Sequence, residues 1–185
     1  MTLLFDLINQ SKKEITRAQY QLVKLLHGQM TFLCRRYVNQ HEDAEECLSD
    51  GFCNVFTGIA GHDYISDDAF VGWVNKIMVN VCLRFLEKKN TFLIIGEEEA
   101  IDIPIQEIAL AHLSTSEILN LIANLPVGYK TVFNMHVIEG YSHEEIASSL
   151  KISEGTSKSQ LSRAKQLLQK MLISNQDFYG KQQSK

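Results

Sequence analysis

Five polar side chains near the C-terminus have the chemistry to hydrogen-bond to DNA. Residues 155–160 are all small or polar, and the side chains that we expect to contact DNA are Thr156, Ser157, Lys158, Gln160 and Arg163. Hydroxyl, amide and guanidinium groups can reach base edges and phosphates. A helix that served only for packing would carry more apolar residues in this segment. The chemistry indicated is therefore recognition by hydrogen bonds and charge.

Two helices joined by a tight turn must position these side chains. We expect the first over residues 142–150, with Ser142 as its N-cap and Glu145 completing a capping box. The second begins near Ser153 or Glu154, and Ile152 in the turn is expected to be buried. The inward face of this second helix carries apolar residues spaced three, four and three positions apart, namely Leu161, Ala164, Leu168 and Met171. The pattern predicts a helix-turn-helix for the major groove, although a plain helical hairpin fits it too.

A second set of candidate residues lies on a helix predicted over residues 68–89. Four polar side chains recur there at steps of four and line one basic strip: Lys76, Asn80, Arg84 and Lys88. Such a strip beside aromatic rings is typical of single-stranded DNA binding, and Trp73 could supply a ring. The alternatives are a solvated face for the strip and a core position for Trp73.

A third set lies on a helix predicted over residues 43–57, whose outward face is acidic. That face carries Asp43, Glu45, Glu46, Asp50 and Asn54. Acidic residues in a first turn suit the helix dipole, so a solvated surface is one interpretation. The other is a docking surface for a basic partner.

Charge is distributed unevenly along the 185 residues, whose net charge is −4. Residues 70–90 hold four bases and one acid, and residues 151–172 hold five bases and one acid. Residues 91–117 between them hold six acids and no base. Two basic islands can bind phosphates locally even though the whole chain is acidic.

The fold class predicted is all-α, because helical periodicity dominates and only two prolines interrupt it. Further helices are expected over residues 20–37, 117–124 and 129–138, whereas residues 1–19 are ambiguous. We expect a helical domain over residues 1–90, an acidic linker over 91–113, a four-helix domain over 114–173 and a frayed polar tail over 174–185.

Several classes of function are excluded by what the sequence lacks. No nucleophile–base pair or phosphate-cradling glycine loop is recognisable, so we expect neither an enzyme nor a bound cofactor. The cysteines contain no CxxC pair, and we expect them to be reduced core or near-core residues without metal: Cys34, Cys47, Cys53 and Cys82. No apolar run is long enough to span a bilayer, so we expect no membrane insertion and a cytoplasmic location.

The ordered set of segments resembles a known family. DAEECLSDGFCNVF, AFVGWVNKIMVNVCLRFLEKK, IANLP and GYSHEEIASSLKISEGTSKSQLSRAKQLLQKM follow one another in the chain. Together they are similar to the small two-domain extracytoplasmic-function (ECF) group of the sigma-70 family of RNA polymerase sigma factors. The resemblance covers about residues 20–172.

This resemblance implies a role for each set of residues. Docking on the β′ clamp of core RNA polymerase would fall to Asp43, Glu46, Asp50 and Asn54. The −10 promoter element, melted to a single strand, would meet Lys76, Asn80, Arg84, Lys88 and Trp73, and the loop at 61–67 would receive a flipped base. The −35 element would meet Thr156, Ser157, Lys158, Gln160 and Arg163, in a domain that also touches the β flap. The resemblance further implies an anti-sigma factor as a partner.

Some positions depart from the family pattern. Ser157 replaces a small apolar residue, Lys151 a glycine in the turn, and Gln160 an arginine, while Ser49 and Gly51 replace commoner Gln and Val. The alternative to a sigma factor is a helix-turn-helix transcriptional regulator that binds DNA as a dimer and does not bind core polymerase.

Overall fold

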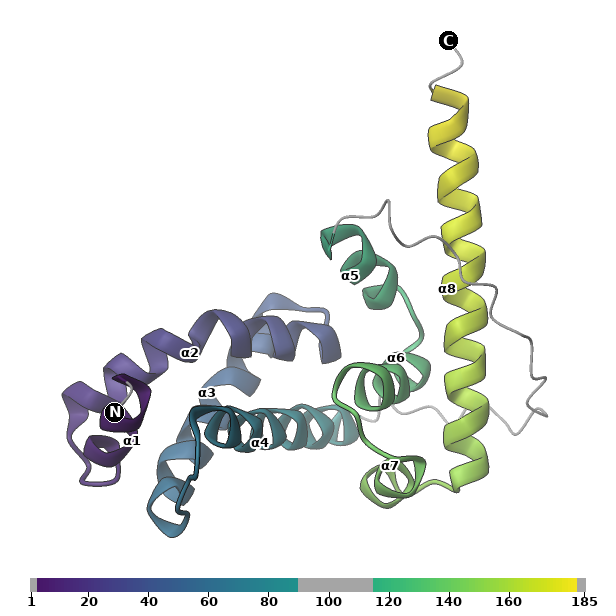
Figure 1. Cartoon of the computed structure of the whole chain (residues 1–185). Helices are drawn as coiled ribbons and strands as arrows, with labels where there is room; N and C mark the ends of the chain where they lie inside the picture. The colour runs from purple at the N-terminus through teal and green to yellow at the C-terminus, as the bar shows by residue number, and fades with distance from the viewer. Residues whose placement is uncertain (1–2, 90–114, 183–185) are drawn as a thin grey trace. The chain divides into compact units, whose positions relative to one another are not determined.

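The computed structural model describes residues 3–89 and 115–182, and each described element is helical (Figure 1). The all-α prediction is therefore confirmed. The chain forms two compact units, Met1–Asn90 and Thr91–Lys185. The acidic linker expected over residues 91–113 and the last three residues of the chain lie outside the described residues.

Unit 1 is a bundle of four helices, drawn in purple to teal in Figure 1. They are α1 (Leu3–Ser11), α2 (Thr16–Tyr37), α3 (His41–Gly58) and α4 (Asp67–Lys88), with a short 3₁₀ turn η1 (Ile59–Gly61) after α3. Helix α1 packs against α2, and α2, α3 and α4 each pack against the other two. The three long helices agree with the predicted ones within a few residues, and α1 occupies the part of the sequence whose pattern is ambiguous.

Helix α4 packs against both α2 and α3. It begins after Ser66, whose Oγ accepts a hydrogen bond from the N–H of Ala69 at 3.1 Å. A row at steps of four is fully buried, comprising Phe70, Val74, Met78 and Cys82. By length and composition alone α4 is apolar enough to cross a bilayer. Its packing between α2 and α3 accounts for that composition, because a core helix needs a wide apolar face.

Helices α3 and α4 cross closely at Gly51. Gly51 is buried, and a Cβ atom built there would overlap the sulfur of Met78 and lie 2.8 Å from its Cε. Met78 is itself fully buried, so its thioether has little room to move aside. The valine that is commoner here in the resembled family would not fit beside this methionine.

Unit 2 contains the helix-turn-helix. Its elements are α5 (Thr115–Ala123), α6 (Val127–Phe133), a π-helical turn η3 (Asn134–Ile138), α7 (His143–Leu150) and α8 (Glu154–Gln182). Helix α8, drawn in green to yellow in Figure 1, packs against α5, α6 and α7. Helix α8 continues to Gln182, into the polar tail that we expected to be frayed from Ser174.

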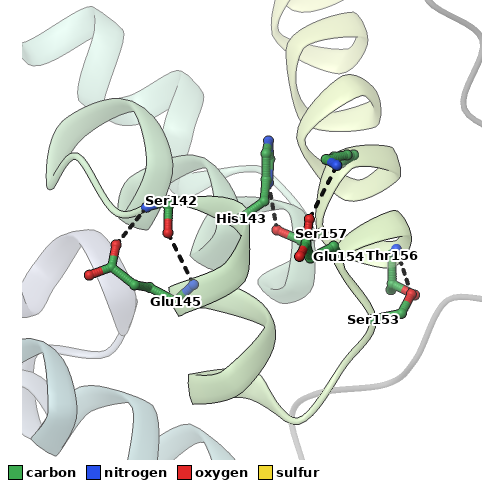
Figure 2. A network of polar contacts seen from close by, with 8 residues as sticks. Ser142, His143, Glu145, Ser153, Glu154, Thr156 and Ser157 are labelled. Carbon is green, nitrogen blue, oxygen red and sulfur yellow. Dashed lines mark hydrogen bonds and ion pairs between the residues drawn. The ribbon is translucent and has the colours of Figure 1, made fainter.

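The predicted capping box begins α7, as Figure 2 shows. Ser142 Oγ accepts from the N–H of Glu145 at 3.2 Å, and Glu145 Oε2 accepts from the N–H of Ser142 at 2.8 Å. Lys151 then ends α7 in the left-handed conformation, with φ of 56°. At the start of α8, Ser153 Oγ accepts from the N–H of Thr156 at 2.9 Å. Ile152 is half-buried, less than we expected.

Two stacked histidines join the helices of this motif. The rings of His136 in η3 and His143 in α7 lie 4.3 Å apart between centroids and 14° from parallel. His136 Nδ1 donates to the backbone carbonyl of Tyr141 at 2.9 Å. His143 Nδ1 lies 2.9 Å from the Oγ of Ser157, which comes from the second turn of α8 (Figure 2). The ring contact therefore joins η3 to α7, and the hydrogen bond between His143 and Ser157 joins α7 to α8.

Because the His143 side chain is partly buried, we predict that unit 2 loses stability at mildly acidic pH. Burial lowers the pKa of His143 below its ordinary 6.5, and the neighbouring His136 and Lys158 lower it further, whereas Glu154 raises it. The unfolded chain therefore binds more protons below about pH 6.5, so the unfolding free energy falls as pH falls through that range. We expect His143→Gln to flatten this dependence relative to the wild-type protein, in calorimetric melts between about pH 5 and 7.5. If the unfolding free energy of the His143→Gln variant fell as steeply with falling pH as that of the wild type, His143 would not be the group responsible.

The Gly51–Met78 contact predicts coupled effects on stability. We expect Gly51→Val to lower the unfolding free energy by about 1–3 kcal/mol through overpacking. Met78→Ala alone should cost about 2–5 kcal/mol, because it leaves a cavity. The double variant should be more stable than the sum of the two losses predicts, since the valine then fills the vacated space. Urea unfolding of the four proteins tests this, and simple additivity would show that the two side chains do not compete.

Candidate nucleic-acid and partner interfaces

The first turns of α8 present a small polar and cationic surface. Lys158 is exposed, and its Nζ donates to Glu154 Oε2 at 3.2 Å, an ion pair within one helical turn. Thr156 and Arg163 are half-buried on the same helix. These three side chains keep polar atoms near solvent in the segment predicted to enter the major groove. Their contact with DNA stays a prediction.

Two of the five residues predicted to contact the −35 element face inward. Ser157 is 0% exposed and Gln160 8% exposed. The Oγ of Ser157 is engaged by His143, and the amide of Gln160 lies over Gly128 of α6, where an added Cβ would be 3.4 Å from Gln160 Oε1. As placed here, neither side chain can read a base edge, so their assignment is corrected. Residues 157, 160, 161 and 164 share one helical stripe, and this spacing could have revealed their burial.

The basic strip of unit 1 lies on the outer side of α4. All four of its side chains are exposed, namely Lys76, Asn80, Arg84 and Lys88. They stand two residues after the members of the buried row, which places them about 200° around the helix from the core. No described residue of unit 1 (residues 3–89) covers the strip, so it can approach a phosphate backbone. That contact also stays a prediction.

Trp73 belongs to a cluster of rings at the start of α4. Its ring centroid lies 5.4 Å from those of His62 and Tyr64 and 5.9 Å from that of Phe70. On its other side it meets Gly58 at the end of α3, where an added Cβ would lie 3.2 Å from the Trp73 ring. Trp73 is half-buried, so it packs inward in part and keeps a solvent-facing side; its contact with DNA stays a prediction.

The loop before α4 contributes residues that the sequence pattern did not single out. Tyr64 meets Phe70 edge to face at 4.8 Å, and burial raises its pKa to about 12. Lys12, from the turn after α1, donates to Asp63 Oδ1 at 3.1 Å and lies 5.5 Å from the centre of the Tyr64 ring. Lys12 and Asp63 are 51 residues apart. No periodic pattern links positions so distant, which is why only the structure reveals the contact.

The acidic face of α3 is only partly available. Glu46, Asp50 and Asn54 are exposed as predicted. Asp43 differs, because both of its carboxylate oxygens accept from Lys89 Nζ, at 2.7 and 2.8 Å. Asp43 therefore holds the end of α4 in place, and a partner would have to compete with Lys89 for it.

The four cysteines are free thiols, and one of them is exposed where we expected a core or near-core position. Cys34, Cys47 and Cys82 are buried, whereas Cys53 is exposed. Among the described residues, no group of three or more histidine, cysteine or acidic side chains is placed to hold a metal ion.

Family models match both units. A model described as "Sigma-70 region 2" matches residues 22–91, and one described as "Sigma-70, region 4" matches residues 115–168. The first match contains α3, α4 with its basic strip, and α2 from Leu22 onward. The second contains the helix-turn-helix.

Relatives of known role cover most of the chain. It is 27% identical over 152 residues to the ECF RNA polymerase sigma factor SigM of Mycobacterium tuberculosis, a match that covers 82% of this chain and 76% of that protein. It is 26% identical over 178 residues to the ECF RNA polymerase sigma factor SigW of Bacillus subtilis, covering 89% and 94%.

A solved structure has a similar fold. The structure of CnrH in complex with the cytosolic domain of CnrY gives a TM-score of 0.50 at 19% identity, covering 91% of this chain and 96% of that one. The two family models and the sequence relatives show that the chain belongs to the sigma-70 family of RNA polymerase sigma factors, in its ECF group.

Proposed function

We propose that this protein binds core RNA polymerase and directs initiation at promoters by contacting both the −10 and −35 elements. The observation that carries the proposal is the surface of unit 1. An exposed acidic patch on α3 and an exposed basic strip on α4 belong to one domain that matches region 2 of the family. An acidic patch suits a basic protein partner, and a basic strip suits a nucleic acid.

The role we propose is binding without catalysis, in the cytoplasm. In unit 1 the polymerase-docking patch would comprise Glu46, Asp50 and Asn54, and we expect it to meet the β′ clamp. The α4 strip would hold the −10 strand by its phosphates, with Trp73 near the bases. In unit 2, Thr156, Lys158 and Arg163 would approach the −35 duplex, in a domain that also touches the β flap. An anti-sigma factor that covers these surfaces is the further partner we expect.

The docking prediction is tested by reversing charge on α3. We expect the protein to co-elute with core RNA polymerase in equal amounts on a sizing column at moderate salt. Glu46→Lys with Asp50→Lys should abolish co-elution, because two repulsive contacts replace two attractive ones. Asp43 is left intact, since its loss would also release Lys89. The matched control is Asp6→Lys with Glu14→Lys, which makes the same charge change at exposed positions elsewhere in unit 1.

Failure of the wild-type protein to bind the polymerase would contradict the proposed function. A dimer on duplex DNA would then favour a helix-turn-helix regulator. Binding that survives the α3 double variant, but not the control, would move the docking surface elsewhere in unit 1.

The −35 prediction is tested at Lys158. Polymerase carrying this protein would first select its promoters from a randomised duplex library. We expect Lys158→Ala to weaken binding to the selected duplex and to lower the slope of log affinity against log salt by about one, as the loss of one phosphate contact does. The matched control is Lys170→Ala, since Lys170 is exposed on the same helix and about 18 Å further along it. An unchanged salt slope would exclude a phosphate contact at Lys158.

A further inference from the structure

The turn after α1 is fixed by its backbone. The N–H of Lys12 donates to the carbonyl of Ile8 at 2.9 Å, and the N–H of Glu14 donates to the carbonyl of Ser11 at 3.0 Å. Glu14 adopts φ of 57°, which reverses the chain toward α2. Leu7 and Ile8 are buried at 4% and 2% exposure. Lys12 therefore projects from a rigid base that is anchored in the core of unit 1.

From this base Lys12 reaches the loop that precedes α4. Its Nζ contacts Asp63 at 3.1 Å, and the same ammonium group lies 5.5 Å from the centre of the Tyr64 ring. The Lys12 side chain is only 20% exposed, whereas that of Asp63 is fully exposed. An exposed ion pair adds little to global stability, so this contact acts on the local conformation of the loop.

The loop held in this way is poised for a ligand with flat rings. Tyr64 and Trp73 lie 5.4 Å apart between centroids at 54°, and His62 lies 5.4 Å from Trp73. The hydroxyl of Tyr64 is buried with no hydrogen-bond partner among the described residues. Ile65, the next residue, is 96% exposed. An exposed apolar tip beside aromatic rings suits stacking with an unpaired base.

We propose that Lys12 is a positioning residue for −10 recognition: by clamping Asp63 and Tyr64, it holds the 62–66 loop in the arrangement that receives an unstacked base. This inference rests on the proposed function and adds to it a role for the N-terminal helix, which lies outside the segment that matches region 2. Lys12 acts through the loop and does not itself contact the base.

The first test uses Trp73, the only tryptophan in the chain, as a reporter of the loop. In the free full-length protein, Lys12→Gln and Asp63→Asn should each shift Trp73 emission to longer wavelength and raise its quenching by acrylamide, because the ring becomes more accessible. Lys13→Gln is the matched control, since Lys13 is adjacent and exposed. The charge swap Lys12→Asp with Asp63→Lys should restore part of the wild-type signal. Unchanged emission in both single variants would overturn the clamp.

The second test measures binding of core polymerase carrying each variant to a fluorescent single strand with the −10 sequence selected by the wild type. We expect Lys12→Gln and Asp63→Asn each to weaken binding by about three- to tenfold, the range that one ion pair and one cation–π contact support. On strands with an abasic site at each position in turn, the difference from wild type should vanish at the position whose base the loop receives.

The two arms separate this proposal from its alternatives. Weaker binding in Lys12→Gln, with unchanged or tighter binding in Asp63→Asn, would show that Lys12 contacts a phosphate and would overturn the positioning role. The positioning role would also be overturned if the variants bound every abasic strand more weakly than the wild type does. If the wild-type complex bound no single strand, the −10 role and the base-receiving role would both fail, while Trp73 emission would still show whether Lys12 holds the loop.

Discussion

The burial of one row of α4 against α2 and α3 determines which face of that helix carries the exposed basic strip. Phe70, Val74, Met78 and Cys82 recur at steps of four and are fully buried. The basic strip recurs at the same step, displaced by two residues, and two residues correspond to about 200° of rotation. Both rows spiral together along the helix, so the strip stays opposite the core over its whole length. Any change that rotates α4 in its packing would turn the strip toward the protein.

Packing sets the exposed surface of the first turns of α8 in a different way. Helix α8 is held at its first turns by Ser157 against His143 and by Gln160 over Gly128. These are polar side chains in core positions, so they orient the helix as well as filling space. A buried hydrogen bond specifies geometry that apolar contacts leave free, because an unmatched partner would be costly. Lys158 then remains on the outer side.

The helices and their faces follow from the sequence, whereas contacts between distant segments do not. The capping box at Ser142, the buried row of α4 and the exposed strip all arise from spacing within one helix, which periodicity reports directly. Residue type misled us at Ser157 and Gln160. Their polarity suggested exposure, whereas their burial follows from their position on the inward stripe of α8.

Other features depend on tertiary contacts and leave no periodic pattern. The ion pair between Asp43 and Lys89 and the clamp of Lys12 on Asp63 join residues 46 and 51 positions apart. Lys130 is likewise 1% exposed, and burial lowers its pKa to about 8, although lysine is among the residue types most often found at the surface.

Two of the departures from the family pattern, Gly51 and Ser157, are matched by contacting side chains elsewhere in the chain. Where the family commonly has valine, Gly51 leaves the space that Met78 fills. Ser157, in place of a small apolar residue, carries a hydroxyl that His143 engages. Lys151 takes the left-handed conformation that glycine adopts without strain, at a cost of about 1–2 kcal/mol. A side chain that departs from the family pattern can be accommodated where a neighbour fills the space or satisfies the polar group, as Met78 does beside Gly51 and His143 does beside Ser157.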